Sequence, residues 1–306
     1  MAKRKILVAG TLAFDSLETP FGKRDMIIGG SANHFSIAAS IFNNLELSSI
    51  IGCDFPEEQI KFLNKRGIGT SNVVRSECGK TFHWKGKYIG SMNEAETLDT
   101  QLNVLLDYDP VINAEGKKCE VLFLANLHPA KQAKVISEAK GAKLIILDTM
   151  NYWIETAFEE LKEVIKKVDI LVINEHEARA ITKQNNVIMA LHEIIKMGPK
   201  TVIIKRGEYG AFVYREGEKF FYVPAYPVTE VVDPTGAGDT FAGGFTGYLS
   251  TSENMDSFNE IKKAMLYGTI TASFMVEDFG HSRLENIKLS DIEKRYKEVL
   301  DMVTIN

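Results

Sequence analysis

The sequence has 306 residues, of which 45% are hydrophobic and 25% charged, and its formal net charge is −5. This is the balance of an ordinary folded protein, and the mild acidity argues against nucleic acid or an anionic membrane as a main partner. Three widely spaced cysteines, Cys53, Cys78 and Cys119, lack metal-ligand spacing and predict reduced, structural thiols. No apolar run has the length of a membrane span or a signal peptide, so we expect a cytoplasmic protein.

Short apolar segments alternate with segments of helical period along most of the chain. The apolar segments predict buried strands at 6–9, 49–51, 121–125, 144–147, 170–173 and 202–204. The periodic segments predict helices at 32–42, 57–65, 130–139 and 154–166, followed by about 238–249, 256–276 and 290–301. This order predicts an α/β fold in one domain over 1–306, with a mostly parallel sheet and helices on both faces.

Two stretches depart from this alternation. Residues 15–29 join the first strand to the first helix, and residues 79–91 alternate aromatic and charged side chains, as an exposed hairpin does. We expect these stretches to form a small β lid over the edge of the sheet. A second hairpin is expected at 211–223, with its turn at 215–218.

The most informative segment is the loop that precedes the helix at 238–249. Pro234 ends the preceding structure, and Gly236 and Gly238 leave backbone N–H groups uncovered by side chains. A glycine turn that leads into a helix N-terminus gathers free N–H donors and the positive end of the helix dipole. The segment therefore predicts an anion site suited to a polyphosphate.

Asp239 lies inside this anion site. One interpretation is structural, since aspartate is a favoured helix cap. The other is catalytic: phosphoryl transfer needs positioning, charge neutralisation and one base, and Asp239 would accept the proton of the attacking hydroxyl.

The string Asp-Pro-Thr-Gly-Ala-Gly-Asp-Thr-Phe at 233–241 resembles the C-terminal motif of the ribokinase-like family, the PfkB carbohydrate kinases. The likeness covers essentially the whole chain and implies a Rossmann-type core with a β lid that uses ATP and Mg²⁺. Asp239 would be the base, and the backbone of Gly236, Ala237 and Gly238 would form the anion hole. Asp233 and Thr235 match positions that in some members help to hold a monovalent cation, which would be K⁺.

Polar residues follow three of the expected strands, where ligands gather in parallel sheets. Asn174 and Glu177 match the family's Asn-x-x-Glu motif, which organises Mg²⁺, and they also have the spacing of a helix capping box. After the next strand, Lys205, Gly207 and Gly210 match a nucleotide-binding strand end, although a solvated turn has the same composition. Asp148 and Asn151 follow the strand at 144–147 and are either phosphate-proximal or a cap.

The substrate side depends on two segments near the N-terminus. Asp15 matches a family aspartate that accepts hydrogen bonds from substrate hydroxyls, and Gly30, Asn33 and His34 open the first helix. The chain departs from the family here, because His34 stands where sugar kinases usually carry asparagine. Asn33 is one residue early and would point about 100° away on a helix.

We therefore expect a sugar kinase, with a nucleoside kinase as the alternative. A third hypothesis is a nucleotide or sugar sensor without catalysis, which would have no need of Asp239. We expect no nucleic acid and no membrane as partner, and a homodimer through the lid is a further hypothesis.

Overall fold

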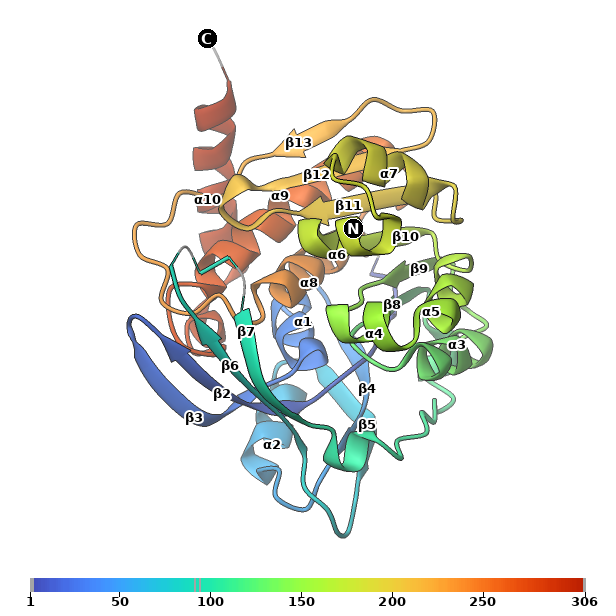
Figure 1. Ribbon diagram of the computed structural model, residues 1–306, viewed down its shortest axis with the longest axis vertical. Helices are drawn as coiled ribbons and strands as arrows, with labels where there is room; N and C mark the ends of the chain where they lie inside the picture. The colour runs from blue at the N-terminus through green and yellow to red at the C-terminus, as the bar shows by residue number, and fades with distance from the viewer. Residues whose placement is uncertain (1–2, 91, 94, 305–306) are drawn as a thin grey trace.

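The computed structural model describes residues 3–90, 92–93 and 95–304, which form a nine-stranded sheet and a separate four-stranded sheet (Figure 1). The larger sheet has the order β13-β12-β11-β10-β9-β8-β1-β4-β5. Its parallel strands are β1 (Ile6–Ala9), β4 (Leu45–Ile51), β5 (Ile68–Arg75), β8 (Val121–Leu124), β9 (Leu144–Leu147), β10 (Ile170–Asn174) and β11 (Thr201–Lys205). β12 (Ala211–Arg215) and β13 (Phe221–Val223) add antiparallel strands at one edge, which confirms the hairpin expected at 211–223.

Helices cover both faces of this sheet, as the continuous apolar strands predict. Alternate residues of one strand enter different cores: Ile6 and Val8 belong to one buried cluster, and Leu7 and Ala9 to the other. The first face is covered by α1 (Ser31–Ala39), α2 (Glu57–Lys65), α8 (Ala237–Leu249), α9 (Phe258–Met275) and α10 (Leu289–Val303). The second is covered by α3 (Pro129–Glu138), α4 (Asn151–Thr156), α5 (Phe158–Ile165), α6 (Glu175–Thr182) and α7 (Val187–Ile195).

The four-stranded sheet, which we call the small sheet, lies at the lower left of the molecule in Figure 1. It consists of β2 (Ala13–Thr19), β3 (Gly22–Gly29), β6 (Phe82–Tyr88) and β7 (Ala95–Gln101), in the order β3-β2-β6-β7. The prediction of a hairpin within 79–91 was wrong, because that stretch supplies only one strand and its partner reaches residue 101. A short 3-10 helix, η1 (Asn103–Leu105), follows the last strand.

Two further expectations need correction. The helix predicted at 154–166 is two helices, because the backbone leaves the helical region at Ala157, with φ −142° and ψ 40°. Cys53 and Cys78 are exposed, so only Cys119 is a buried thiol. Within the described residues, no helix has the length and apolar character needed to cross a membrane.

Candidate active site

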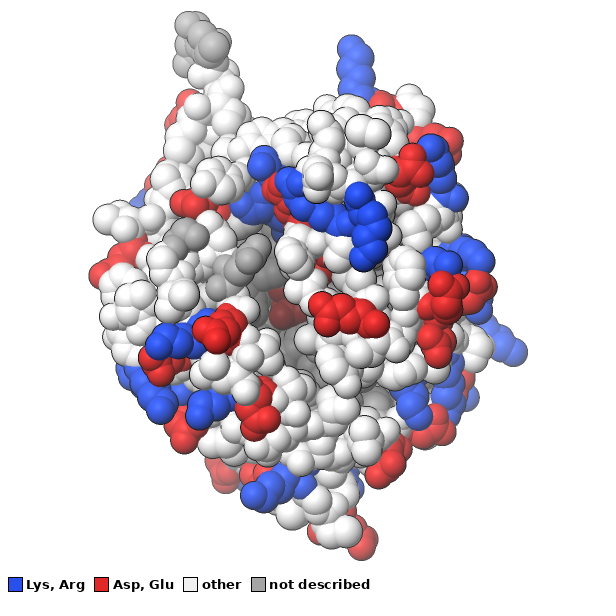
Figure 2. All heavy atoms as spheres, viewed as in Figure 1, with Lys and Arg blue, Asp and Glu red and all other residues white. Residues whose placement is uncertain are grey.

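Three parallel strands deliver polar side chains to one edge of the large sheet. Asp148 directly follows β9, Asn174 ends β10, and Lys205 ends β11, where it is paired in register with Asn174. Because the strands are parallel, their carboxyl ends meet at the edge where ligands of such sheets bind. Figure 2 shows a hollow near the middle of the molecular surface in view, with acidic atoms inside it.

The loop before α8 has the form expected of an anion site. Gly236 is the N-cap of the helix, with φ 76°, and no side chain of the described residues caps the helix there. Asp239 lies in the first turn and is not the cap, so the purely structural interpretation of this residue loses its main support. The Ala237 N–H donates to the Pro234 carbonyl at 3.1 Å, and the N–H groups of Gly238 and Asp239 have no acceptor among the described residues and are left for another one.

Asp233 anchors this loop to the end of α9. Its Oδ1 accepts from the Thr235 backbone N–H at 2.9 Å, and its Oδ2 accepts from the Gly280 N–H at 3.0 Å. The Asp233 side chain is fully buried. The Thr235 hydroxyl donates to the Tyr88 hydroxyl at 3.2 Å, which connects the loop to the small sheet.

His34 lies between the loop and Asp15. A Cβ added to Gly236 would stand 2.4 Å from the His34 ring, so the loop backbone rests directly on the imidazole. The Nε2 of His34 is 3.9 Å from Asp15 Oδ2, too far for a hydrogen bond, and neither ring nitrogen has a partner among the described residues. Burial opposes the charged ring, but the carboxylates of Asp15, Asp239 and Asp233 outweigh it and raise the pKa of His34. The imidazole is available as a hydrogen-bond donor beside a carboxylate acceptor.

Asp15 reaches this position because glycine makes room for it. A Cβ on Gly29 would lie 1.8 Å from Asp15 Oδ2, and Gly30 follows with a φ of 97°. Any other residue at Gly29 would displace the carboxylate. Asp15 is buried, with 5% of the residue exposed, and its carboxylate faces His34.

Lys205 and Asp148 form a buried ion pair next to the glycine loop. The Lys205 ammonium donates to Asp148 Oδ2 at 2.8 Å. A Cβ on Gly238 would stand 3.1 Å from the same ammonium, so this positive charge adjoins the first turn of α8. Burial lowers the pKa of Lys205, but Asp148 and Glu177 outweigh it and hold the pKa above its ordinary value. A positive charge is thus fixed where the loop's N–H groups converge.

Asp239 and Glu177, whose carboxyl groups are both affected by Asp148 and Lys205, have raised pKa values. Burial, with Asp148 next in importance, raises the pKa of Asp239 to about 6. The same two causes raise the pKa of Glu177 to about 8. A carboxylate with a pKa near neutrality is well matched to accept a proton from a hydroxyl.

The spacing of Asn174 and Glu177 produces the capping box that the sequence allows. Asn174 Oδ1 accepts from the Glu177 N–H, and Glu177 Oε2 accepts from the Asn174 N–H, both at 2.8 Å. Within the described ranges there is no group of three or more His, Cys, Asp or Glu side chains arranged to hold a metal. Magnesium needs few protein ligands, so one carboxylate beside a phosphate site fits it.

Other expected residues lie elsewhere or have structural partners. Asn33 contacts the His281 Nδ1 at 3.3 Å and accepts from the Gln59 side chain at 3.2 Å, so its amide is already used within the protein. Gly207 begins η3 (Gly207–Tyr209), and Gly210 follows it where the chain enters β12. The Lys205–Asp148 pair was not foreseen, although both residues were noted at the ends of strands.

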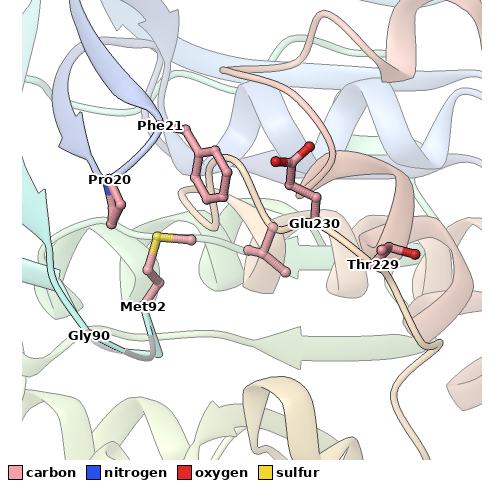
Figure 3. Close-up of a pocket in the computed structure, with 7 residues that line it drawn as sticks. Pro20, Phe21, Gly90, Met92, Thr229 and Glu230 are labelled. Carbon is pink, nitrogen blue, oxygen red and sulfur yellow. The ribbon is translucent and has the colours of Figure 1, made fainter.

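A second hollow, of about 560 Å³, lies between the tips of the small sheet and the loop before Asp233. Figure 3 shows Phe21 and Met92 directed toward it, opposite Glu230 and Thr229. None of the residues that line it belongs to the cluster around Asp239. This hollow lies between the small sheet and the loop, apart from the charged residues of the candidate site.

Comparison with known proteins agrees with this architecture. The family model described as pfkB family carbohydrate kinase matches residues 12–287. A cytidine kinase from Thermococcus kodakarensis is 31% identical over 252 residues, covering 79% of this chain and 88% of the relative. A ribokinase from Lactococcus lactis is 31% identical over 329 residues, covering 96% of this chain and 98% of the relative.

Among solved structures, a protein described as ribokinase II from E. coli, in complex with ATP and Mg²⁺, superposes with a TM-score of 0.79 at 20% identity. The match covers 96% of this chain and 99% of that one, and it shows a shared fold. The chain therefore belongs to the pfkB family of carbohydrate kinases and is a phosphotransferase that acts on an alcohol group.

Proposed function

We propose that this chain transfers the γ-phosphoryl group of ATP to a hydroxyl of a small sugar or a nucleoside, with Asp239 as general base. The observation that carries the proposal is the position of Asp239: a half-buried carboxylate, with a pKa raised to about 6, in the first turn of a helix that no side chain caps. The hydroxyl proton moves to Asp239 as the oxygen attacks the γ-phosphorus in line. The bond to the β-phosphate breaks and ADP leaves.

On the acceptor side, Asp15 and His34 form a pair with opposite hydrogen-bonding character. The carboxylate accepts from one hydroxyl, and the unpartnered imidazole donates to the acceptor molecule. The backbone of Gly30 adjoins the same space. In this proposal His34 takes the hydrogen-bonding role of the family's asparagine, while Asn33 is a structural residue held by His281 and Gln59.

On the donor side, the backbone N–H groups of Gly236, Ala237 and Gly238 bind the developing charge of the transferred group, and Lys205 adds a fixed positive charge. When bound, Mg²⁺ would neutralise the phosphates, with Glu177 and Asn174 holding its hydration shell. Gly207 and Gly210 would lie beside the nucleotide. Asp233 and Thr235 orient the loop, and a requirement for K⁺ at this position is part of the proposal.

The decisive experiment is Asp239→Asn, which keeps the shape of the side chain and removes the base. We expect kcat to fall by about 10²–10⁴-fold while ATP binding is retained. ADP release is measured over a panel of free sugars, sugar phosphates, polyols and nucleosides, with and without K⁺. Unchanged kcat in Asp239→Asn would contradict the mechanism. ATP binding by the wild-type chain without turnover on any acceptor would favour the sensor.

We also propose that two copies pair through the small sheet. β7 is its edge strand and all seven of its residues are exposed, so a row of backbone groups is open to a second strand. Light scattering across a dilution series measures the molar mass. Thr97→Pro, which removes one backbone donor from β7, is expected to shift the protein toward the monomer.

A further inference from the structure

A pocket of about 450 Å³ lies beside the acceptor side of the site and has no role in the mechanism above. Its volume is within the range of pockets that bind small molecules. One wall comes from η1 and the other from the ends of β8 and α4. The residues that define it best are Leu102, Leu105, Leu127, His128, Tyr152 and Trp153.

The aromatic wall is joined to the acceptor loop by two hydrogen bonds. The Trp153 indole N–H donates to Asn126 Oδ1 at 2.7 Å, and the Asn126 backbone N–H donates to Ser31 Oγ at 3.2 Å. Ser31 begins α1 two residues after Gly29, which packs against the Asp15 carboxylate. Asn126 therefore links the pocket to the loop that holds Asp15, the proposed partner of the acceptor's hydroxyl.

The opposite wall belongs to the small sheet. η1 continues from β7, and its Val104 N–H donates to the Lys80 carbonyl just before β6 at 3.2 Å. A ligand in the pocket would thus lie between η1, which is hydrogen-bonded to the segment before β6, and the core.

The lining has the chemistry of a site for a flat, weakly polar group. The Trp153 ring meets the His128 ring with centroids 5.0 Å apart and the Tyr152 ring at 4.7 Å, both edge-to-face. Four leucines supply most of the remaining surface, and Tyr108, Ala130, Lys131 and Thr156 complete it. A free sugar presents hydroxyls in every direction and would leave them unpaired against leucine, whereas a heterocyclic base buries its flat faces on aromatic and aliphatic groups.

We infer that this pocket binds the base of a nucleoside whose sugar hydroxyl is directed to Asp239. The inference rests on the proposed kinase function and narrows its substrate class from sugars in general to nucleosides. Asp15 and His34 then hold the sugar ring, and the pocket holds the base. The free sugar lacks the group that this pocket recognises.

The test uses Trp153 as its own reporter. The chain has two tryptophans, so Trp84→Phe leaves Trp153 as the single one. In that background, cytidine and adenosine are titrated separately, with ribose as the sugar control, and the indole emission is followed without ATP. We expect at least one nucleoside to change the emission and to bind at least tenfold more tightly than ribose.

Tyr152→Ala is the first pocket variant, because its side chain is 41% exposed and its loss opens no internal cavity. Since base stacking on an aromatic side chain contributes about 1–3 kcal/mol, nucleoside binding should weaken by roughly 5- to 150-fold. Ribose binding should stay within twofold. Phe220→Ala, at a ring 42% exposed on the β12–β13 hairpin, is the matched control and should change neither.

Ala130→Phe is the second variant and fills the pocket without removing a contact that exists. It should abolish nucleoside binding and leave ribose binding intact. Equal losses for ribose and nucleoside, or nucleoside affinity unchanged in both variants, would overturn the inference. Efficient turnover of ribose with no nucleoside bound would also overturn it while leaving the kinase proposal standing. Failure of the kinase proposal is seen separately, as absent Asp239-dependent ADP release.

Discussion

Replacing Gly236 by alanine tests whether the loop backbone and the His34 ring act as one unit. Gly236 has φ 76°, and an added Cβ would stand 2.4 Å from His34 Cδ2 and 2.5 Å from its Cγ. Contacts this short require the ring or the loop to move. Because the loop carries the proposed anion hole and the ring faces Asp15, both halves of the site should be disturbed.

The cost can be estimated from two separate effects. An L-residue in the left-handed region costs about 1–2 kcal/mol, and forcing extra volume into a packed site costs about 1–3 kcal/mol. Gly236→Ala should therefore lower the free energy of unfolding by about 2–5 kcal/mol. Gly217 provides the matched control, since it has φ 81° and no heavy atom within 4 Å of an added Cβ. Gly217→Ala should show only the first effect.

The assay is urea unfolding of both variants, together with kcat/KM for ADP release. A double variant, Gly236→Ala with His34→Ala, removes the ring that the new methyl group would meet. The two changes should then be non-additive by about 0.5–3 kcal/mol, with the double variant more stable than the sum of the single effects predicts. Equal losses for Gly236→Ala and Gly217→Ala, or strict additivity with His34→Ala, would refute the reasoning.

Three further predictions follow from the charges around the loop. Because Asp239 must be ionised to act as base and its pKa is raised to about 6, kcat should be retained above pH 6 and fall about tenfold per unit below it; a flat pH–rate profile between pH 5 and 7 would contradict this. Lys205→Met should lower kcat by about 10²–10³-fold. Asp148→Asn should lower kcat by less, because the Lys205 ammonium remains. A single-turnover rate of Lys205→Met close to that of the wild type would show that Lys205 does not act in the reaction. Glu177→Gln keeps an acceptor for the capping box, so the free energy of unfolding in urea should change little. The Mg²⁺ concentration for half-maximal activity should rise. An unaltered Mg²⁺ dependence would mean that Glu177 only caps the helix.

The sequence predicted the buried strands well because they are apolar on both faces. Residues 6–9, 144–147 and 170–173 need no alternation to be recognised, and the structure places a strand at each. β7 could not be predicted in this way. Its sequence, Ala-Glu-Thr-Leu-Asp-Thr-Gln, is exposed at every position, so no hydrophobic pattern marks it, and only pairing with β6 defines it as a strand.

The same limit applies to the candidate site. Each polar residue at a strand end could be assigned to the carboxyl edge, because that follows from parallel pairing alone. Which side chains touch there depends on packing between elements distant in sequence. Lys205 meets Asp148, and His34 meets Gly236, through contacts that no local pattern encodes. The aromatic pocket beside Trp153 also depends on where η1 lies, after a strand the sequence does not signal.

The two interpretations of Asn174 and Glu177 turn out to be compatible, and the geometry explains why. The capping bond occupies Glu177 Oε2, so the carboxyl group is held in place by the helix start and its second oxygen is free for another partner. Burial and the nearby Asp148 raise the pKa of this group to about 8, which means that its charged form is favoured only when positive charge is close. Lys205 supplies part of that charge, and a hydrated cation carried by a polyphosphate would supply the rest. The helix cap therefore positions the carboxylate, and in the proposed mechanism the strand end would bring it to the phosphates.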